Sequence, residues 1–177
     1  MTQVIVLNGG SSSGKSRLAR ELQGVLPGAW LSLSVDDLVD AMPPALVSGG
    51  DGIGFGDAGE VSVGEQFRTL ETAWLAGIAA MARAGARVVL DDVFLGGAES
   101  QSRVRQQLEG LDVLWVGVRC APEVAAEREK ARGDRTTGMA ELQAEVVHEG
   151  VHYDLEVDTR VSASLECARA VAARVDS

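Results

Sequence analysis

The chain has 177 residues, of which 46% are hydrophobic, and a formal net charge of −10 at pH 7. This length suits one globular domain with a sizeable core, and the acidic balance argues against nucleic acid or an anionic membrane as a partner. Because Cys120 and Cys167 are isolated, no run is long enough to span a membrane, and the first residues lack the basic and apolar regions of a secretion signal, we expect a cytoplasmic protein.

Short apolar runs alternate along the chain with segments of helical length. Strands are expected at 3–8, 29–34, 87–92, 112–118 and 154–157. Helices are expected at 15–26, 64–84, 98–108, 122–131, 138–148 and 161–175. The middle strand runs are apolar at nearly every position, as strands buried on both faces are. We therefore predict an α/β fold of three layers, a parallel five-stranded sheet flanked by helices, in a single domain over 1–177.

The first strand run leads directly into GGSSSGKS, residues 9–16. The stretch matches the phosphate-binding P-loop, G-x-x-x-x-G-K-[ST], and lies between a strand and a helix as that loop requires. Gly9 and Gly14 permit backbone dihedrals that a side chain would block, Lys15 would reach the β- and γ-phosphates of ATP, and Ser16 would offer its hydroxyl to Mg²⁺. The predicted nucleotide-binding residues of this stretch are Gly9, Gly10, Ser11, Ser12, Ser13, Gly14, Lys15, Ser16 and Arg17.

The second strand run is followed by two acidic residues, Asp36 and Asp37. A carboxylate at the end of a strand beside the P-loop lies in the crevice where ligands bind. Asp36 could therefore accept the proton of an acceptor hydroxyl as that hydroxyl attacks the γ-phosphorus. Helix capping by Asp36 or Asp37, with Ser34 nearby, fits the same residues equally well.

The segment from Asp36 to Ala82, where a kinase of this layout receives its second substrate, contains a single cation, Arg68. An anionic acceptor would need more positive charge, so we expect a neutral, partly apolar acceptor with a hydroxyl. Phe67, Leu70 and Trp74 recur at helical spacing, although such a stripe also fits a protein core. The predicted acceptor-binding residues are Asp36, Met42, Phe55, Phe67, Leu70, Trp74 and Phe94.

A glycine-rich stretch at 48–64 contains seven glycines and interrupts the alternation of strands and helices. Loops of this length tend to be functional or mobile. We expect a mobile segment on the acceptor side over about 43–64. A solvated surface loop, with a hairpin at Val61–Val63, is the alternative.

Two further groups of charged residues fit phosphoryl transfer. The run RVVLDD ends in Asp91 and Asp92, and either carboxylate could hold the magnesium shell or cap the next segment. In ARGDRTTG, residues 131–138, Arg132 and Arg135 could belong to a lid over about 130–140 that closes on ATP. The alternative for these arginines is pairing with the negative end of a helix dipole.

The stretch HEGVH, residues 148–152, matches the zinc-protease pattern H-E-x-x-H. That pattern requires both histidines on one face of an unbroken helix, and Gly150 interrupts it. The sequence has only two histidines. We therefore predict no zinc site and expect a helix end that leads to the last strand.

Several stretches together resemble the chloramphenicol phosphotransferase family of P-loop kinases: LNGGSSSGKS, VDDLVDAMP, MARAGARVVLDDVFLGG, LDVLWVGVRC, ARGDR, VVHEGV and YDLEVDT. The resemblance spans almost the whole chain and implies a nucleoside-kinase-like P-loop NTPase fold. It also implies ATP-dependent phosphorylation of the primary 3-hydroxyl of chloramphenicol or a similar neutral antibiotic, which would confer resistance by inactivation. Asp36 would be the base, Lys15 would lie at the phosphates, and the ARGDR arginines would lie over the nucleotide. The alternatives are a P-loop kinase of another small hydroxylated metabolite and an ATP-binding sensor without transfer activity.

Overall fold

The computed structural model describes residues 1–47, 50–57, 59–132 and 138–175. Its main sheet has five parallel strands in the order β2-β5-β1-β6-β7. The strands are β1 (Val4–Asn8), β2 (Trp30–Ser34), β5 (Arg87–Asp92), β6 (Val113–Arg119) and β7 (Leu155–Asp158). These five strands confirm the predicted parallel sheet, and their ends lie within one residue of the expected positions.

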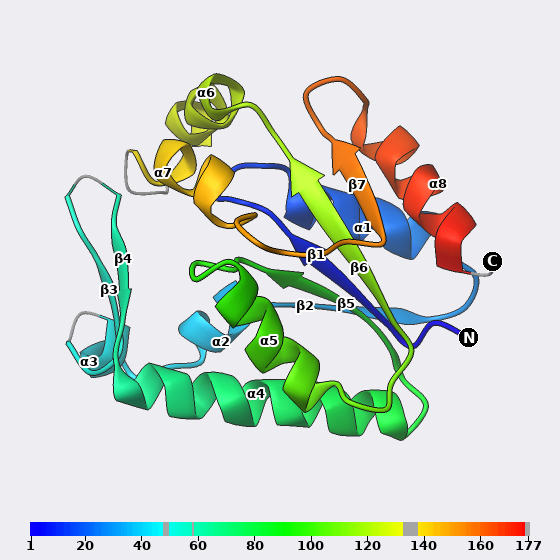
Figure 1. Cartoon of the computed structure of the whole chain (residues 1–177), viewed down its shortest axis with the longest axis horizontal. Coiled ribbons are helices and arrows are strands. Elements are labelled where there is room, and N and C mark those ends of the chain that lie inside the picture. The colour runs from blue at the N-terminus through cyan, green and yellow to red at the C-terminus, as the bar shows by residue number, and fades with distance from the viewer. Residues whose placement is uncertain (48–49, 58, 133–137, 176–177) are drawn as a thin grey trace.

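Helices cover both faces of this sheet, as Figure 1 shows. The helices are α1 (Lys15–Val25), α2 (Val35–Asp40), α3 (Pro44–Val47), α4 (Glu65–Arg83), α5 (Ala98–Gln107), α6 (Pro122–Arg132), α7 (Met139–Val146) and α8 (Ser164–Val175). The short helices α2 and α3 lie outside the stretches predicted to be helical, and the other six coincide with them. The three-layer α/β architecture is therefore confirmed.

The central strand β1 contributes side chains to two separate cores. Ile5 and Leu7 pack with α1 and α8 on one face of the sheet. Val4 and Val6 pack with α4 and α5 on the other face. This alternation explains why the run is apolar throughout, since successive side chains of a strand point to opposite faces and both faces are covered.

The carboxyl ends of three neighbouring strands bring the predicted polar residues together. In the pairing of β1 with β5, Asn8 lies opposite Asp92, and in the pairing of β2 with β5, Ser34 lies opposite Asp91. The loop that begins at Gly9 therefore starts beside both acids. Parallel pairing thus places the P-loop, the acids of β5 and the start of α2 at one edge of the sheet.

A second, two-stranded sheet lies in the glycine-rich stretch. β3 (Ile53–Phe55) pairs antiparallel with β4 (Val61–Val63). Ile53, together with Leu38 and Met42 of the α2 region and Phe67 of α4, forms a small third core. The hairpin was expected only as an alternative and only around β4. The mobility of 43–64 stays a prediction.

The HEGVH stretch follows the end of α7 rather than forming part of a helix. His148 is buried, and its Nδ1 lies 2.6 Å from the Tyr153 hydroxyl oxygen. The backbone N–H of His152 donates to Gln101 of α5 over 3.0 Å. The stretch is thus a helix end leading to β7. Among the residues that the structure describes, no helix is long and apolar enough to cross a membrane.

Candidate active site

The P-loop has the backbone geometry of an anion-binding loop. Ser12 has φ 58° and Gly14 has φ 96°, so two residues of the loop have a left-handed φ before α1 begins. The left-handed conformation at residue 14 is one that glycine adopts readily, so a glycine is needed there. A glycine is needed at residue 9 for a different reason, because a Cβ there would lie 2.5 Å from the carbonyl oxygen of Val118. The prediction that Gly9 serves an unusual dihedral is therefore replaced by one of close packing against β6.

Lys15 and Ser16 connect the loop to the end of β5. The Lys15 ammonium is buried, donates to the Gly10 carbonyl over 2.9 Å and lies 3.7 Å from Asp91 Oδ1. The Ser16 hydroxyl donates to Asp91 Oδ2 over 2.7 Å. Buried charged groups are usually paired with an opposite charge and hydrogen-bonded, as Lys15 is here. The lysine is therefore held at the loop with its charge compensated.

Two buried hydroxyls of the loop fit an oxygen-rich anion. Ser12 Oγ and Ser13 Oγ are buried and have no hydrogen-bond partner among the described residues. Buried polar groups nearly always have a partner, so these hydroxyls and the left-handed loop suit a phosphate. Ser16 and Asp91 offer a hydroxyl and a carboxylate oxygen, which are ligands that Mg²⁺ accepts together with phosphate oxygens.

A cavity of about 570 Å³ extends from this loop between the helices. On its P-loop side it is lined by Ser11, Ser12, Gly14, Lys15, Ser16 and Arg17, all of them predicted nucleotide-binding residues. Gly9, Gly10 and Ser13 shape the loop but do not line the cavity. The volume is within the range that small-molecule sites occupy.

Asp36 lines the same cavity, whereas Asp37 has a structural role. Ser34 is the N-cap of α2, and its hydroxyl accepts the Asp37 N–H over 3.1 Å. The Asp37 carboxylate in turn accepts the Ser34 N–H over 2.7 Å, completing a capping box. Capping therefore falls to Ser34 and Asp37, while the exposed Asp36 is placed at the cavity.

The predicted apolar acceptor residues divide between the cavity and the core. Phe55 and Phe67 line the cavity. Met42, Leu70, Trp74 and Phe94 do not, and each packs in a core instead. Phe94 is 1% exposed, with its ring centroid 6.4 Å from that of Trp115. The structure therefore does not bring these four side chains to the cavity: Met42, Leu70 and Trp74 pack between α2 and α4, and Phe94 packs among α4, α5 and the sheet.

Hairpin and α2 residues that the sequence interpretation missed supply much of the apolar wall. They are Val35, Val39, Ile53, Val61 and Val63. In the hairpin, Ile53 lies opposite Val63 and Phe55 opposite Val61, so these side chains share one face. The stretch IGF, in which two apolar residues flank a glycine, is the sequence pattern that could have predicted this apolar face.

Three further cavity residues were also missed. Gln143 of α7 accepts the backbone N–H of Ser11 over 2.8 Å. Arg128 of α6 donates to the Thr159 carbonyl over 2.9 Å and to its hydroxyl over 3.1 Å. The Thr159 hydroxyl donates to the Ser13 carbonyl over 2.6 Å. Only Arg128 had a sequence signal, since it lies one helical turn before Arg132.

The predicted lid, over about 130–140, falls partly outside the described residues, which leave out 133–137. Arg132 is the last residue of α6, and Arg135 lies outside the described residues. The buried Glu129 of α6, before that gap, accepts the backbone N–H groups of Gly138 and Ala140, which follow it, each over 2.8 Å. Glu129 therefore joins the start of α7 to α6.

The two acids at the end of β5 differ in environment. Asp91 contacts Lys15 and Ser16, whereas Asp92 Oδ1 accepts the Val93 N–H over 2.7 Å. Burial, together with the nearby charges of Glu71 and Asp91, raises the pKa of Asp92 to about 6. Asp91 is thus the acid placed to share a cation with Ser16.

We expect Asp92→Asn to stabilise the protein in a pH-dependent way. The folded pKa of Asp92, about 6, is above its ordinary 3.8, so its contribution to stability is lost as pH rises through 6. Removing the charge should raise the free energy of unfolding at pH 7.5 by on the order of 2–3 kcal/mol, and leave it nearly unchanged at pH 3.5. Urea unfolding without nucleotide measures this. An equal change at both pH values would contradict the assignment.

Together, these features define the class of protein. A parallel sheet whose first strand leads into a P-loop, with the loop lysine and serine against an acid of the neighbouring strand β5, defines a P-loop nucleotide-binding fold. The chain belongs to the chloramphenicol phosphotransferase-like family, whose model matches residues 2–176. This match confirms the resemblance, and the protein is a small-molecule kinase.

Relatives and solved structures agree with this class. A protein of Mycobacterium tuberculosis strain H37Rv, provisionally named an O-phosphotransferase, is 30% identical over 94% of this chain and 79% of its own length. The structure of the Deinococcus radiodurans tunicamycin resistance protein has a TM-score of 0.70 at 20% identity, covering 99% of this chain and 96% of that chain. The Mycobacterium tuberculosis APS kinase has a TM-score of 0.65 at 17% identity, covering 99% and 98%. At these identities the two structures support the fold.

Proposed function

We propose that this kinase transfers the γ-phosphate of ATP to the primary 3-hydroxyl of chloramphenicol or of a similar neutral hydroxylated antibiotic, and so inactivates it. The observation that carries the proposal is the position of Asp36, whose neighbour Asp37 forms the capping box of α2 with Ser34 and which itself lines the cavity that the P-loop also lines. Family membership supports it, as does the O-phosphotransferase name of the mycobacterial relative.

The acceptor side of the cavity suits a neutral molecule with an apolar face. Its hairpin wall is formed by Ile53, Phe55, Val61 and Val63. The cation Arg68 lines the cavity but donates to Glu71 over 2.8 Å, so its charge is compensated within the protein. A carboxylate or phosphate on the acceptor would compete with Glu71 for that arginine. A neutral alcohol meets no such obstacle.

In the proposed reaction, the P-loop N–H groups and Lys15 hold the phosphates, and Asp36 accepts the proton of the attacking hydroxyl. The new bond joins the acceptor oxygen to the γ-phosphorus, and the bond from that phosphorus to the departing ADP oxygen breaks. Ser16 and Asp91 would hold Mg²⁺, which when bound neutralises charge on the phosphates.

We also propose that Arg132 and Arg135 act on the transferred phosphate. A fixed positive charge with a planar donor fork suits phosphate oxygens. We expect the double variant Arg132→Ala with Arg135→Ala to lower turnover by about 10- to 10³-fold, less than the full effect of an arginine finger. Steady-state rates measure this. If the double variant turned over as fast as the parent, the two arginines would have no part in transfer, and the alternative of a helix terminus would hold.

ATP consumption against a panel of alcohols tests the proposed function. The panel holds chloramphenicol and related amphenicols, other hydroxylated antibiotics, shikimate and nucleosides. We expect ADP formation to depend on an amphenicol and to be weak with shikimate, which carries a carboxylate. Consumption driven best by shikimate or a nucleoside would assign another acceptor. ATP binding with no acceptor-dependent consumption would indicate a sensor.

A further inference from the structure

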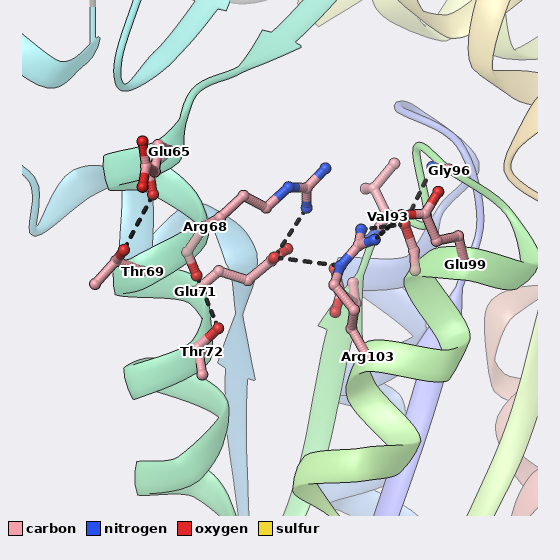
Figure 2. A network of polar contacts seen from close by, with 11 residues as sticks. Glu65, Arg68, Thr69, Glu71, Thr72, Val93, Gly96, Glu99 and Arg103 are labelled. Carbon is pink, nitrogen blue, oxygen red and sulfur yellow. Dashed lines mark hydrogen bonds and ion pairs between the residues drawn. The ribbon is translucent and has the colours of Figure 1, made fainter.

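A carboxylate on α4, Glu71, lines the cavity between two arginines (Figure 2). Arg68 Nη1 donates to Glu71 Oε2 over 2.8 Å. Arg103 Nε, on α5, lies 3.8 Å from the same oxygen. Glu71 is thus held from its own helix and from a neighbouring one.

Arg103 is itself held in place by α5. Its Nη1 donates to Glu99 Oε1 over 3.2 Å and its Nη2 to Ser100 Oγ over 2.9 Å. Ser100 Oγ also accepts the Gly96 N–H over 3.1 Å. The Arg103 Nε is buried and has no hydrogen-bond partner among the described residues. A guanidinium oriented by these two hydrogen bonds presents a fixed charge to the Glu71 carboxylate.

The second oxygen of Glu71 is the one that a ligand could use. Both arginine contacts involve Oε2, and Oε1 takes part in neither. The Glu71 side chain is 20% exposed at the cavity. An ionised carboxylate is an acceptor only, with capacity for more than one donor at each oxygen. The cavity that Glu71 lines is also lined by Asp91 and Asp92, at the end of β5.

We propose that Glu71 accepts a hydrogen bond from a second donor of the acceptor molecule, a hydroxyl or an amide N–H other than the hydroxyl that takes the phosphate. This inference rests on the proposed function. Arg68 and Arg103 are positioning residues that hold the carboxylate. The acceptor class is then a neutral alcohol with one apolar face toward the hairpin and a further donor toward α4. An acceptor with a negative group at this position is repelled by Glu71.

The test combines variants of Glu71 with acceptors that lack one donor. The acceptors are chloramphenicol, its analogue without the secondary hydroxyl, and its analogue methylated at the amide nitrogen. For the parent we expect the acceptor KM to rise about 10- to 100-fold with one of the two analogues, and the affected analogue identifies the donor. Glu71→Ala should raise the KM for chloramphenicol by a similar factor and Glu71→Gln by less, with the KM for ATP unchanged.

The decisive comparison is whether the two losses add. If Glu71 binds the missing donor, Glu71→Ala should show no further loss with the affected analogue. Glu65→Gln, at the exposed start of the same helix, is the matched control and should behave as the parent. Equal KM values of the parent for all three compounds, or fully additive losses, would overturn the inference and leave the proposed function standing. A parent that phosphorylates none of them would overturn the proposed function, and the inference with it.

Discussion

Lys15→Ala should lower phosphoryl transfer by about 10³-fold or more while the protein remains folded. Lys15 is the lysine that lines the cavity, and its ammonium is buried against the Gly10 carbonyl and Asp91. Its removal leaves the γ-phosphate without the buried cation of the loop. Steady-state rates, nucleotide titration by calorimetry and a thermal melt separate lost chemistry from lost structure.

The control for this variant removes a cation elsewhere. Arg169 is an exposed residue of α8 and lies outside the cavity lining. Arg169→Ala should therefore keep the rate and nucleotide affinity of the parent. If Lys15→Ala also kept both, the loop would not be the phosphate site.

Asp36→Asn should slow transfer by about 10²- to 10⁴-fold with little change in melting temperature. The asparagine keeps the size of the side chain but cannot take the proton of the acceptor. Nucleotide affinity should stay at the parental value, because Asp36 follows β2 and is not part of the P-loop. Single-turnover rates with bound ATP measure the loss in the chemical step itself.

The neighbouring acid provides a matched control. Asp37 accepts the Ser34 N–H and hydroxyl in the capping box of α2. Asp37→Asn should cost at most about 1 kcal/mol of stability and leave the transfer rate within a few-fold of the parent. The reverse pattern, a slow Asp37→Asn and a normal Asp36→Asn, would move the base to Asp37.

The sheet and the phosphate loop could be predicted from the sequence because both depend on local patterns. The strands of the main sheet lie in short runs rich in apolar residues, and GGSSSGKS follows the first run directly. The roles of Asp36 and Asp37 could not be separated, since they depend on which residue is the N-cap. A shift of α2 by one residue would exchange them, and only the structure places the cap at Ser34.

The acceptor wall was harder to predict because it depends on distant packing. Phe94 follows the acids of β5 in sequence, yet its ring turns into the core beside Trp115. The hairpin residues reach the cavity only because the hairpin packs on α2 and α4. Gln143 and Thr159 meet the loop from more than a hundred residues away, and no local pattern marks such contacts.

The most direct test of the central claim is to identify the product formed from ATP and chloramphenicol. Mass spectrometry detects the phosphate ester, and phosphorus–proton coupling in NMR shows which carbon bears it. We expect one product, esterified at the primary 3-hydroxyl, formed by the parent and nearly absent with Asp36→Asn. An ester at the secondary hydroxyl, or equal product from the Asp36→Asn variant, would contradict the account.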